Sequence, residues 1–376
     1  MIYCDFSNAL NDLDDNLRGL MMKKRNSLSR RKVIATIGGT ILAAPYVWSR
    51  HAWAAQQLPI RTPGGSFDEI KREHVYEPFQ KATGIEIVPV AATVAKLLAM
   101  HRANQMEVDL IDTGDDTLLE LHRAGALMPI DYGAFKLTNP DDLDPAGKRK
   151  EQVGNFVYAM VTGFRTDAYP KGKEPKSWAE FWDIKAFPGQ RTMPDMASGS
   201  PNLEFALIAD GVAQDKVYPI DIDRAFKSMS RVRPAVTKFW DTGALSTQML
   251  TDKEVVLATL WSTRLGVAID KGAPLGAQWN QNMKLVQSYG IPAGSRNVQA
   301  AQQFIDFSLQ PDIQSNWMRA YKAVPVNKKA YGATAPELIN PQTNQPWTQS
   351  GFTRNIEWWA ENRSRVNTAW SKWIVG

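Results

Sequence analysis

Cysteine is almost absent from this sequence, and its absence excludes several kinds of site. The single cysteine of the 376 residues is Cys4. Beyond it the chain has no thiol for a nucleophile, a cysteine-ligated zinc ion, an iron–sulfur cluster or a disulfide. Any function of the rest of the chain must therefore use oxygen, nitrogen and aromatic groups.

Histidine is also scarce, and the common motifs of catalysis are missing. After residue 55 the histidines are His74, His101 and His122, and none belongs to an HxxxH pair. The chain has no GxSxG elbow, no phosphate-binding loop and no dinucleotide fingerprint after a strand. We therefore expect a protein that is not an enzyme and holds no cofactor and no metal. A secreted enzyme on a similar fold is the alternative.

A surplus of positive charge is present only at the beginning of the chain. Residues 1–55 hold eight Lys/Arg and four Asp/Glu, which leaves 36 basic and 35 acidic residues for 56–376. Nucleic-acid binding requires clustered basic residues across a domain, so we expect no nucleic-acid partner. The length predicts about two domains, and the 44% hydrophobic content is that of a globular chain.

Residues 1–55 have the order of an export signal. Basic residues at 23–25 and 30–32 precede a weak apolar run over 33–47, and Ala52-Trp53-Ala54 offers a cleavage site. The run is too short to span a membrane. Paired arginines predict a twin-arginine signal, with a Sec signal as the alternative. Translation is expected to start at Met21 or Met22, and the mature chain to be soluble in the periplasm.

Expected strands and helices alternate along the rest of the chain. Ser66–Glu69 and Ser177–Glu180 both match a capping box, which marks the first turn of a helix. This β-α order predicts parallel sheets with helices on their faces. Expected strands are 58–62, 85–90, 108–111, 156–161 and 255–260, and expected helices are 66–84, 94–102, 117–123, 203–209, a helix after Asp221, 298–309 and 353–362.

Four aspartates cluster around the end of the expected strand 108–111. They are Asp109, Asp112, Asp115 and Asp116, and their spacing does not match a calcium loop. They form either a solvated loop, with Asp115 or Asp116 capping the next helix, or a set of carboxylates that face a ligand. Ligands of open α/β sheets bind beyond the carboxyl ends of strands, where this loop lies.

Tryptophan is abundant, with eleven after residue 55. Trp240, Trp261 and Trp279 lie at expected strand or loop junctions in the second half. Each is either a core residue or a ligand contact. Aromatic faces together with carboxylates suit an amine ligand, because a ring attracts a cation and a carboxylate pairs with it.

Seven segments follow one another along the chain in a recognisable order, at residues 61–66, 108–112, 177–183, 204–211, 254–261, 290–297 and 304–307. In this order they resemble the extracellular solute-binding proteins of ABC importers, in the spermidine/putrescine-binding branch. The resemblance covers most of 58–335.

The resemblance implies a type II periplasmic-binding-protein fold, with two α/β lobes joined by two crossover strands. Each lobe would be a mainly parallel sheet with flanking helices. The crossovers would fall near Val161–Phe164 and Val286–Tyr289. Lobe 1 would be 56–162 plus 288–335, and lobe 2 would be 163–287 plus the 336–376 tail.

The resemblance also implies a ligand cleft between the lobes and a membrane permease as partner. The protein would be a monomer that carries a small solute to that permease. Carried over by position, the cleft residues are Gly65, Ser66, Asp112, Thr113, Gly114, Phe164, Glu204, Trp240, Trp261, Trp279 and Gln287.

The chain departs from polyamine binders at several of these positions. At the position of Gln287, the resemblance to polyamine binders implies an acidic residue. The amide of Gln287 carries no charge that can pair with a ligand ammonium. Arg165 and Arg264 lie near the expected cleft, where either can meet a carboxylate. We therefore expect an amine-bearing, polyamine-like solute, with an amino acid, an ω-amino acid, another small organic solute or a receptor-coupled sensing role as alternatives.

Overall fold

The computed structural model describes residues 56–199, 201–333, 339–340, 345–347 and 350–376. The predicted export signal and the predicted start at Met21 or Met22 lie outside these residues. Among the described residues, no helix combines the length and the apolar character needed to cross a bilayer.

The central strands form one sheet with the order β2-β1-β3-β9-β5-β8-β6-β7. Three short strands add to its middle, since β10 pairs with β5 while β4 and β13 pair with β9. The strands are β1 (Gln57–Arg61), β2 (Glu86–Val90), β3 (Leu110–Gly114), β4 (Leu127–Met128), β5 (Val153–Arg165), β6 (Arg191–Pro194), β7 (Val236–Trp240), β8 (Leu257–Trp261), β9 (Leu275–Pro292), β10 (Val324–Pro325) and β13 (Phe352–Thr353), and a separate pair is formed by β11 (Ile339–Asn340) and β12 (Gln345–Pro346).

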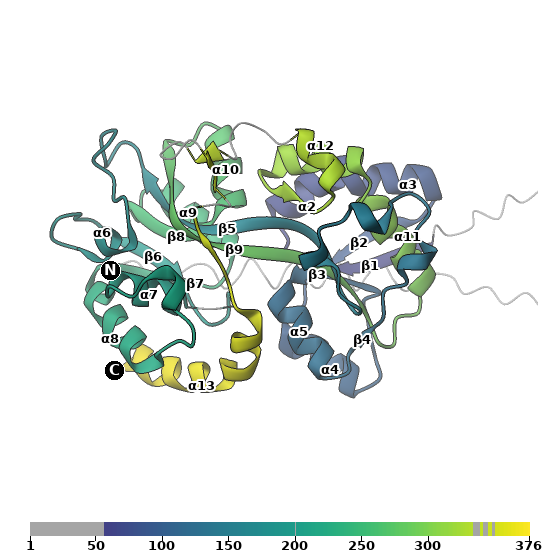
Figure 1. Cartoon of the computed structure of the whole chain (residues 1–376), viewed down its shortest axis with the longest axis horizontal. Helices are drawn as coiled ribbons and strands as arrows, with labels where there is room; N and C mark the ends of the chain where they lie inside the picture. The colour runs from purple at the N-terminus through teal and green to yellow at the C-terminus, as the bar shows by residue number, and fades with distance from the viewer. Residues whose placement is uncertain (1–55, 200, 334–338, 341–344, 348–349) are drawn as a thin grey trace, which may run out of the picture. The chain divides into compact units, whose positions relative to one another are not determined.

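The two ends of the sheet are parallel and its middle is antiparallel. β1 pairs in parallel with β2 and β3, and β6 pairs in parallel with β7 and β8. The long strands β5 and β9 pair with each other in antiparallel fashion and extend from one end to the other (Figure 1). The expected α/β class with two crossover strands is confirmed.

Helices cover both parts of the sheet, which we call lobe 1 (the β1–β4 side) and lobe 2 (the β6–β8 side). In lobe 1 they are α2 (Ser66–Lys71), a π-helical turn η1 (Arg72–Tyr76), α3 (Glu77–Thr83), α4 (Val94–Arg102), α5 (Asp115–Arg123), α11 (Val298–Ser308) and α12 (Pro311–Tyr321). In lobe 2 they are α6 (Trp178–Trp182), α7 (Leu203–Ala209), α8 (Ile222–Val232), α9 (Gly243–Thr251), α10 (Ser262–Asp270) and α13 (Ile356–Val375). Short 3-10 turns η2 to η7 lie at 132–134, 140–142, 145–147, 214–216, 233–235 and 328–333.

Each lobe has its own hydrophobic core. Along β5 the core membership changes between Phe156, which packs in lobe 1, and Ala159, which packs in lobe 2. Along β9 it changes between Leu285 and Tyr289. The lobe boundaries at 162 and 288 stay predictions, and this packing favours a slightly earlier first boundary. From the tail, Trp359 joins the lobe 2 core.

Of the two predicted serine N-caps, the one at Ser177 is confirmed and the one at Ser66 is wrong. Ser177 is the N-cap of α6, and its hydroxyl accepts from the Glu180 amide at 3.2 Å. Ser66 is instead the first residue of α2, which follows Gly65, and its hydroxyl accepts from Arg264 at 3.1 Å. Gly65 has φ of 61°, and a Cβ there would lie 3.0 Å from Arg264, so glycine suits both the backbone and this contact.

Candidate functional site

A fully buried ion pair lies at the carboxyl end of β3. The Lys71 ammonium of α2 donates to the Asp112 carboxylate, and neither side chain is exposed. Lys71 also donates to the Tyr289 hydroxyl at 2.7 Å. Burial lowers the pKa of Lys71 and raises that of Asp112, while each partner's charge opposes the other's shift.

Two further side chains of the protein donate hydrogen bonds to the Asp112 carboxylate. Gln287 of β9 donates to Asp112 at 2.8 Å, and Asn155 of β5 donates at 3.3 Å. The Lys71 ammonium lies 4.6 Å from the ring centre of Tyr289 and 5.0 Å from that of Phe67. An ammonium from the chain itself therefore occupies the carboxylate that the sequence analysis assigned to a ligand.

Asp116, in the first turn of α5, connects lobe 1 to the tail of lobe 2. Its carboxylate lies 3.1 Å from Arg354 Nη1 and 2.8 Å from Arg363 Nη2. Burial alone would raise the pKa of Asp116, but the two guanidinium groups hold it below its usual value. Arg363 also lies 3.3 Å from Glu120 and donates to the Gly199 carbonyl at 2.7 Å.

Asp115 lies beside these groups without a comparable cation of its own. Burial and the neighbouring charge of Asp116 raise the pKa of Asp115 to about 7. Burial also raises the pKa of Tyr158 in β5, and the charges of Asp116 and Asp115 add to that shift. The Tyr158 ring meets the edge of Trp261, with centroids 6.3 Å apart. Asp115 is thus near enough to Tyr158 for its charge to act on that residue, and Tyr158 in turn contacts Trp261.

Several buried polar atoms of lobe 2 have no hydrogen-bond partner in the protein. They are Asn202 Nδ2 and Oδ1, Glu204 Oε2, and Nε and Nη2 of Arg354. Glu204 Oε1, by contrast, accepts from Tyr218 and Trp359, both at 2.6 Å. Buried polar atoms are almost always hydrogen-bonded, so a group of unpartnered ones indicates a place for a polar ligand or water.

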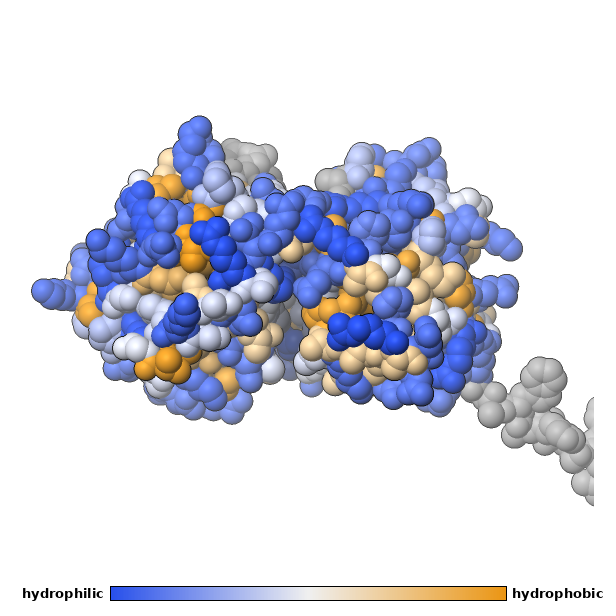
Figure 2. All heavy atoms as spheres, turned by 90° about the horizontal axis from the view of Figure 1, so that it is seen from below, coloured by the Kyte–Doolittle hydropathy of each residue, from blue (hydrophilic) through white to orange (hydrophobic). Residues whose placement is uncertain are grey.

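A second contact joins the lobes near the start of α2. Arg264 of α10 donates to the Gly64 carbonyl at 2.9 Å and to the Ser66 hydroxyl at 3.1 Å. Seen from the α5 and α13 side, the surface is hollowed between the two lobes (Figure 2). Lobe 1 and lobe 2 are therefore bridged in this structure by Arg264 and, separately, by the arginines of the tail.

The arrangement of two α/β lobes, two shared strands and polar groups between them matches one family over most of the chain. The model of the family described as "Bacterial extracellular solute-binding protein" matches residues 74–343. The chain belongs to this family.

Two relatives of this chain have names that state a bound solute. One is the gamma-aminobutyric acid-binding protein of Pseudomonas aeruginosa, 24% identical over 85% of this chain and 92% of the relative. Another is the spermidine/putrescine-binding periplasmic protein of Escherichia coli, 25% identical over 83% of this chain and 93% of the relative.

Solved structures of the same fold include AgtB from A. tumefaciens R10 in complex with agropinic acid. It is 26% identical, with a TM-score of 0.77, over 85% of this chain and 99% of that one. The Atu4243 GABA receptor is 29% identical, with a TM-score of 0.73, over 85% of this chain and 97% of that one.

The structure distributes the residues predicted for the cleft over several environments. Trp240 is fully buried, and its indole nitrogen donates to the Thr259 carbonyl at 2.8 Å. Trp279 stacks on Trp347 with centroids 5.2 Å apart, and Phe164 packs in the lobe 2 core. Trp261 is half-buried between Trp240 and Tyr158.

The remaining predicted residues lie nearer the lobe junction. Gly65 and Ser66 contact Arg264, while Thr113 and Gly114 end β3 directly before Asp115. Glu204 lies at the start of α7 with one oxygen unpartnered, whereas Gln287 is turned to Asp112. The ligand-binding role of the whole set stays a prediction.

Two residues of the lobe junction were missed by the sequence analysis. Tyr158 lies in a correctly expected strand, but nothing in its neighbours distinguishes it from a core residue. Arg354 lies in the tail beyond the family match, where no motif singles it out. Its burial and its pairing with Asp116 arise from contacts between segments far apart in the sequence.

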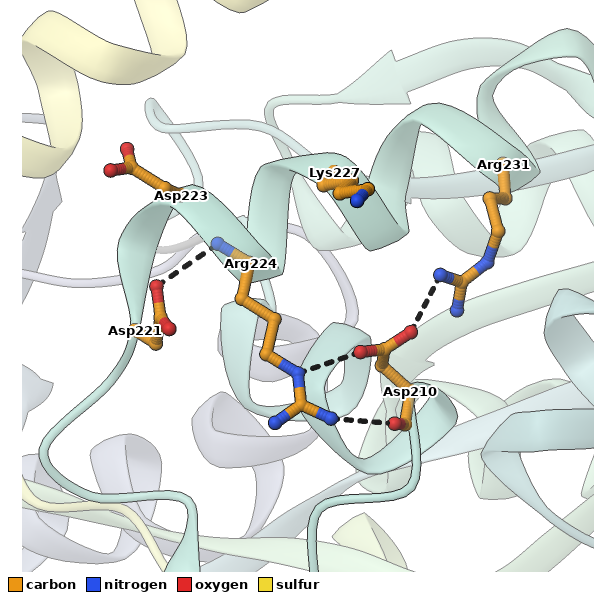
Figure 3. A pocket seen from close by; sticks show the side chains of 6 residues that line it. All are labelled: Asp210, Asp221, Asp223, Arg224, Lys227 and Arg231. Atoms are coloured by element: carbon orange, nitrogen blue, oxygen red, sulfur yellow. Dashed lines mark hydrogen bonds and ion pairs between the residues drawn. The ribbon is translucent and has the colours of Figure 1, made fainter.

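A charged surface pocket lies elsewhere, on lobe 2 (Figure 3). It is lined by Asp210, Asp221, Asp223, Arg224, Lys227 and Arg231. Asp210 accepts from Arg224 and Arg231, both at 2.6 Å, and Asp221 accepts from the Arg224 amide to cap α8. The charges of Asp210, Arg224 and Arg231 already pair with one another, so we do not assign the ligand to this pocket.

Proposed function

We propose that this protein captures a small amine-bearing solute between its two lobes and delivers it to the permease of an ABC importer. The observation that supports the proposal is the region of Asp115, Tyr158 and Trp261 where the lobes meet: no ion pair of Asp115 is found among the described residues, its charge acts on Tyr158, and the Tyr158 ring lies edge-on to Trp261. Such a site favours an ammonium, because both the carboxylate and the ring faces attract positive charge.

Two ligand classes fit the family. The relatives include proteins that bind spermidine and putrescine and proteins that bind gamma-aminobutyric acid. A polyamine-like solute and an ω-amino acid share an ammonium on a flexible apolar chain. The amine role that the sequence analysis gave to Asp112 passes in this proposal to Asp115, because Lys71 already neutralises Asp112.

The mechanism is binding followed by hinge closure, with no bond made or broken. β5 and β9 connect the lobes and are the elements that would bend. A solute that contacts both lobes at once stabilises the bridged state over an open one. The contacts of Arg264 with Gly64 and Ser66 supply part of the bridge without a solute.

We propose further that the protein is exported to the periplasm and acts as a monomer. The family is one of extracellular proteins, and a relative is named a periplasmic protein. N-terminal sequencing of the protein recovered from the periplasm checks cleavage near Ala55. Size-exclusion chromatography with light scattering checks the oligomeric state.

The proposed function is tested by thermal shift with a panel of putrescine, spermidine, 4-aminobutyrate and several α-amino acids. At least one amine-bearing solute should raise the Tm by several degrees at a concentration far above its Kd. Asp115→Asn should abolish that shift, whereas Asp210→Asn, in the separate surface pocket, should leave it intact. A panel without any shift would contradict the proposal.

A further inference from the structure

Arg354 carries a guanidinium that the protein satisfies only in part. Its Nη1 pairs with Asp116 at 3.1 Å, and its Cζ lies 4.8 Å from the ring centre of Trp359. Nε and Nη2 have no hydrogen-bond partner, although the residue is only 9% exposed. Leaving the donors of a buried charged group without hydrogen bonds costs free energy, so these two nitrogens require an acceptor.

The other arginines at or near the junction are more fully engaged. All three guanidinium nitrogens of Arg165 donate hydrogen bonds, two of them to Asp167 and one to the Leu250 carbonyl. In Arg264 and in Arg363, both terminal nitrogens donate hydrogen bonds to other residues of the protein. Within the part of the chain that the structure describes, Arg354 is the arginine with two buried nitrogens left without a partner.

Further unpartnered atoms lie in the same region. Burial alone would lower the pKa of Arg354, but the charges of Asp116 and Glu204 raise it, which places both acids close by. Glu204 Oε2 is itself unpartnered, as are both polar atoms of Asn202 two residues earlier. These donors and acceptors belong to α7 with the residue before it and to the segment before α13, and Asp116 pairs with Arg354 from the facing lobe.

We propose that Arg354 binds the anionic end of the solute, so that the ligand is a zwitterion with its carboxylate on Arg354 and its ammonium on Asp115. This inference rests on the proposed function, because it assumes that the solute lies between the lobes. The planar guanidinium fork offers Nε and Nη2 side by side, which is the geometry that a carboxylate matches with two parallel hydrogen bonds.

The same arrangement disfavours a diamine. A second ammonium placed at Nε and Nη2 of Arg354 would meet two donors and a like charge, and like charges repel strongly where water is excluded; the carboxylate of Asp116 beside it is already paired with Arg354 and Arg363. Arg354 also lies beyond residue 343, where the family match ends. The distinction between a diamine and an amino acid would therefore be made by the tail and not by the matched part of the chain.

The test compares ligands that differ only at the proposed anionic end. Titration calorimetry of the full chain with 4-aminobutyrate, its amide 4-aminobutanamide and putrescine gives the affinity ratio of the carboxylate to its neutral and cationic analogues. The wild type should favour the carboxylate at least tenfold over both. Arg354→Gln should reduce that ratio to near one, because a charge-assisted pair contributes about 1.5–3 kcal/mol, or roughly 10- to 150-fold.

Arg363→Gln is the matched control, since Arg363 also pairs with Asp116 but has its terminal nitrogens engaged. It should weaken all three ligands alike and leave the ratio unchanged. If Arg354→Gln fails to fold, the crystal structure of the wild-type complex decides, with a ligand carboxylate oxygen expected about 3 Å from Arg354 Nε or Nη2.

Three results would overturn the inference. They are a wild type that binds putrescine as tightly as 4-aminobutyrate, a ratio that survives Arg354→Gln, and a complex in which only water contacts these nitrogens. In each of them an amine ligand still binds, so the proposed function stands. Absence of binding by every amine and amino acid in the thermal-shift panel would instead remove the proposed function itself.

Discussion

At the scale of single residues, the Lys71 ammonium neutralises the Asp112 carboxylate, which therefore has little charge left to attract a ligand. The two residues lie 41 positions apart and meet in a region without water access. Desolvation penalises each charge, and the ion pair with its further hydrogen bonds compensates for that penalty. Asp115, three residues after Asp112, lacks such a partner and is therefore the stronger candidate for a ligand.

Removing one partner of this pair should destabilise the fold. Lys71→Met leaves an uncompensated buried carboxylate, so we expect the free energy of unfolding in urea to fall by about 3–5 kcal/mol. The double variant Lys71→Met/Asp112→Leu should recover much of that loss, because no buried charge remains. Lys96→Met is the control, since the Lys96–Glu107 pair is exposed and should contribute little. Equal effects of Lys71→Met and Lys96→Met would contradict this account.

The Asp115 carboxylate should make the unliganded protein less stable as the pH rises. Its folded-state pKa of about 7 exceeds the unfolded value, so its stabilising contribution is complete below about pH 4 and is lost as the pH rises through 7. The groups that act on it are Asp116, Arg354 and Arg149. Asp115→Asn should therefore raise the Tm at pH 8 and change it little at pH 4. A higher Tm of equal size at both pH values would show that its titration is not the cause.

The opposite dependence applies to binding. An ammonium ligand prefers the ionised Asp115, so its affinity should increase between pH 6 and pH 8. Calorimetry at these two pH values, with a ligand whose own amine stays charged, checks the direction. A flat profile would indicate that the ligand ammonium pairs elsewhere.

At the scale of helices and strands, two capping-box sequences have different outcomes. Ser177 caps α6 as its sequence predicts. Ser66 matches the same pattern, yet Gly65 precedes the helix and the Ser66 hydroxyl contacts Arg264 from the other lobe. A local pattern states what a segment can form in isolation, and a tertiary contact can redirect its polar group.

These two serines give a matched pair of variants. Ser177→Ala should reduce the free energy of unfolding by about 1 kcal/mol, the usual contribution of an N-cap. Ser66→Ala should change stability less, because no amide of α2 depends on its hydroxyl. Chemical denaturation of both variants measures the difference. A larger loss for Ser66→Ala would indicate that its contact with Arg264 contributes more than a cap.

At the scale of the whole molecule, the tail holds the two lobes together from one side. Arg354 and Arg363 reach from the lobe 2 side to Asp116 and Glu120 of α5, and Glu357 of α13 lies 3.0 Å from Arg123 and 3.2 Å from Arg149. Ion pairs that exist only when the lobes meet stabilise the bridged state without ligand. The stronger these pairs are, the less binding free energy the ligand must supply to bring the lobes together.

Weakening this bridge should open the unliganded protein. Arg363→Gln removes charge from a mostly buried pair, so we expect a larger radius of gyration by small-angle X-ray scattering and a Kd raised several-fold. Saturating ligand should restore the wild-type value. Arg123→Gln is the control, because its pairs with Glu357 and Glu361 are more exposed and screened. An unchanged radius of gyration in Arg363→Gln would show that the tail does not hold the lobes.

The sequence by itself determined the class of this protein. The absence of thiols and catalytic motifs excluded several kinds of enzyme site, and the alternation of strands and helices predicted an α/β fold, because short stretches of chain express local periodicity and composition directly. The expected helix over 94–102 and the glycine that ends α3 at Gly84 are confirmed for this reason. The two lobes and the solute-binding role were implied by the resemblance of the ordered segments to a known family.

Only the tertiary structure decided which charged groups remain available between the lobes. Asp109, Asp112, Asp115 and Asp116 are equivalent in the sequence. Packing then gives Asp112 a lysine, Asp116 two arginines and Asp109 the backbone and side chain of Asn297, while no ion pair of Asp115 is found among the described residues. Their partners lie up to about 250 residues away in the chain, and no local pattern records which distant side chain will neutralise a given carboxylate.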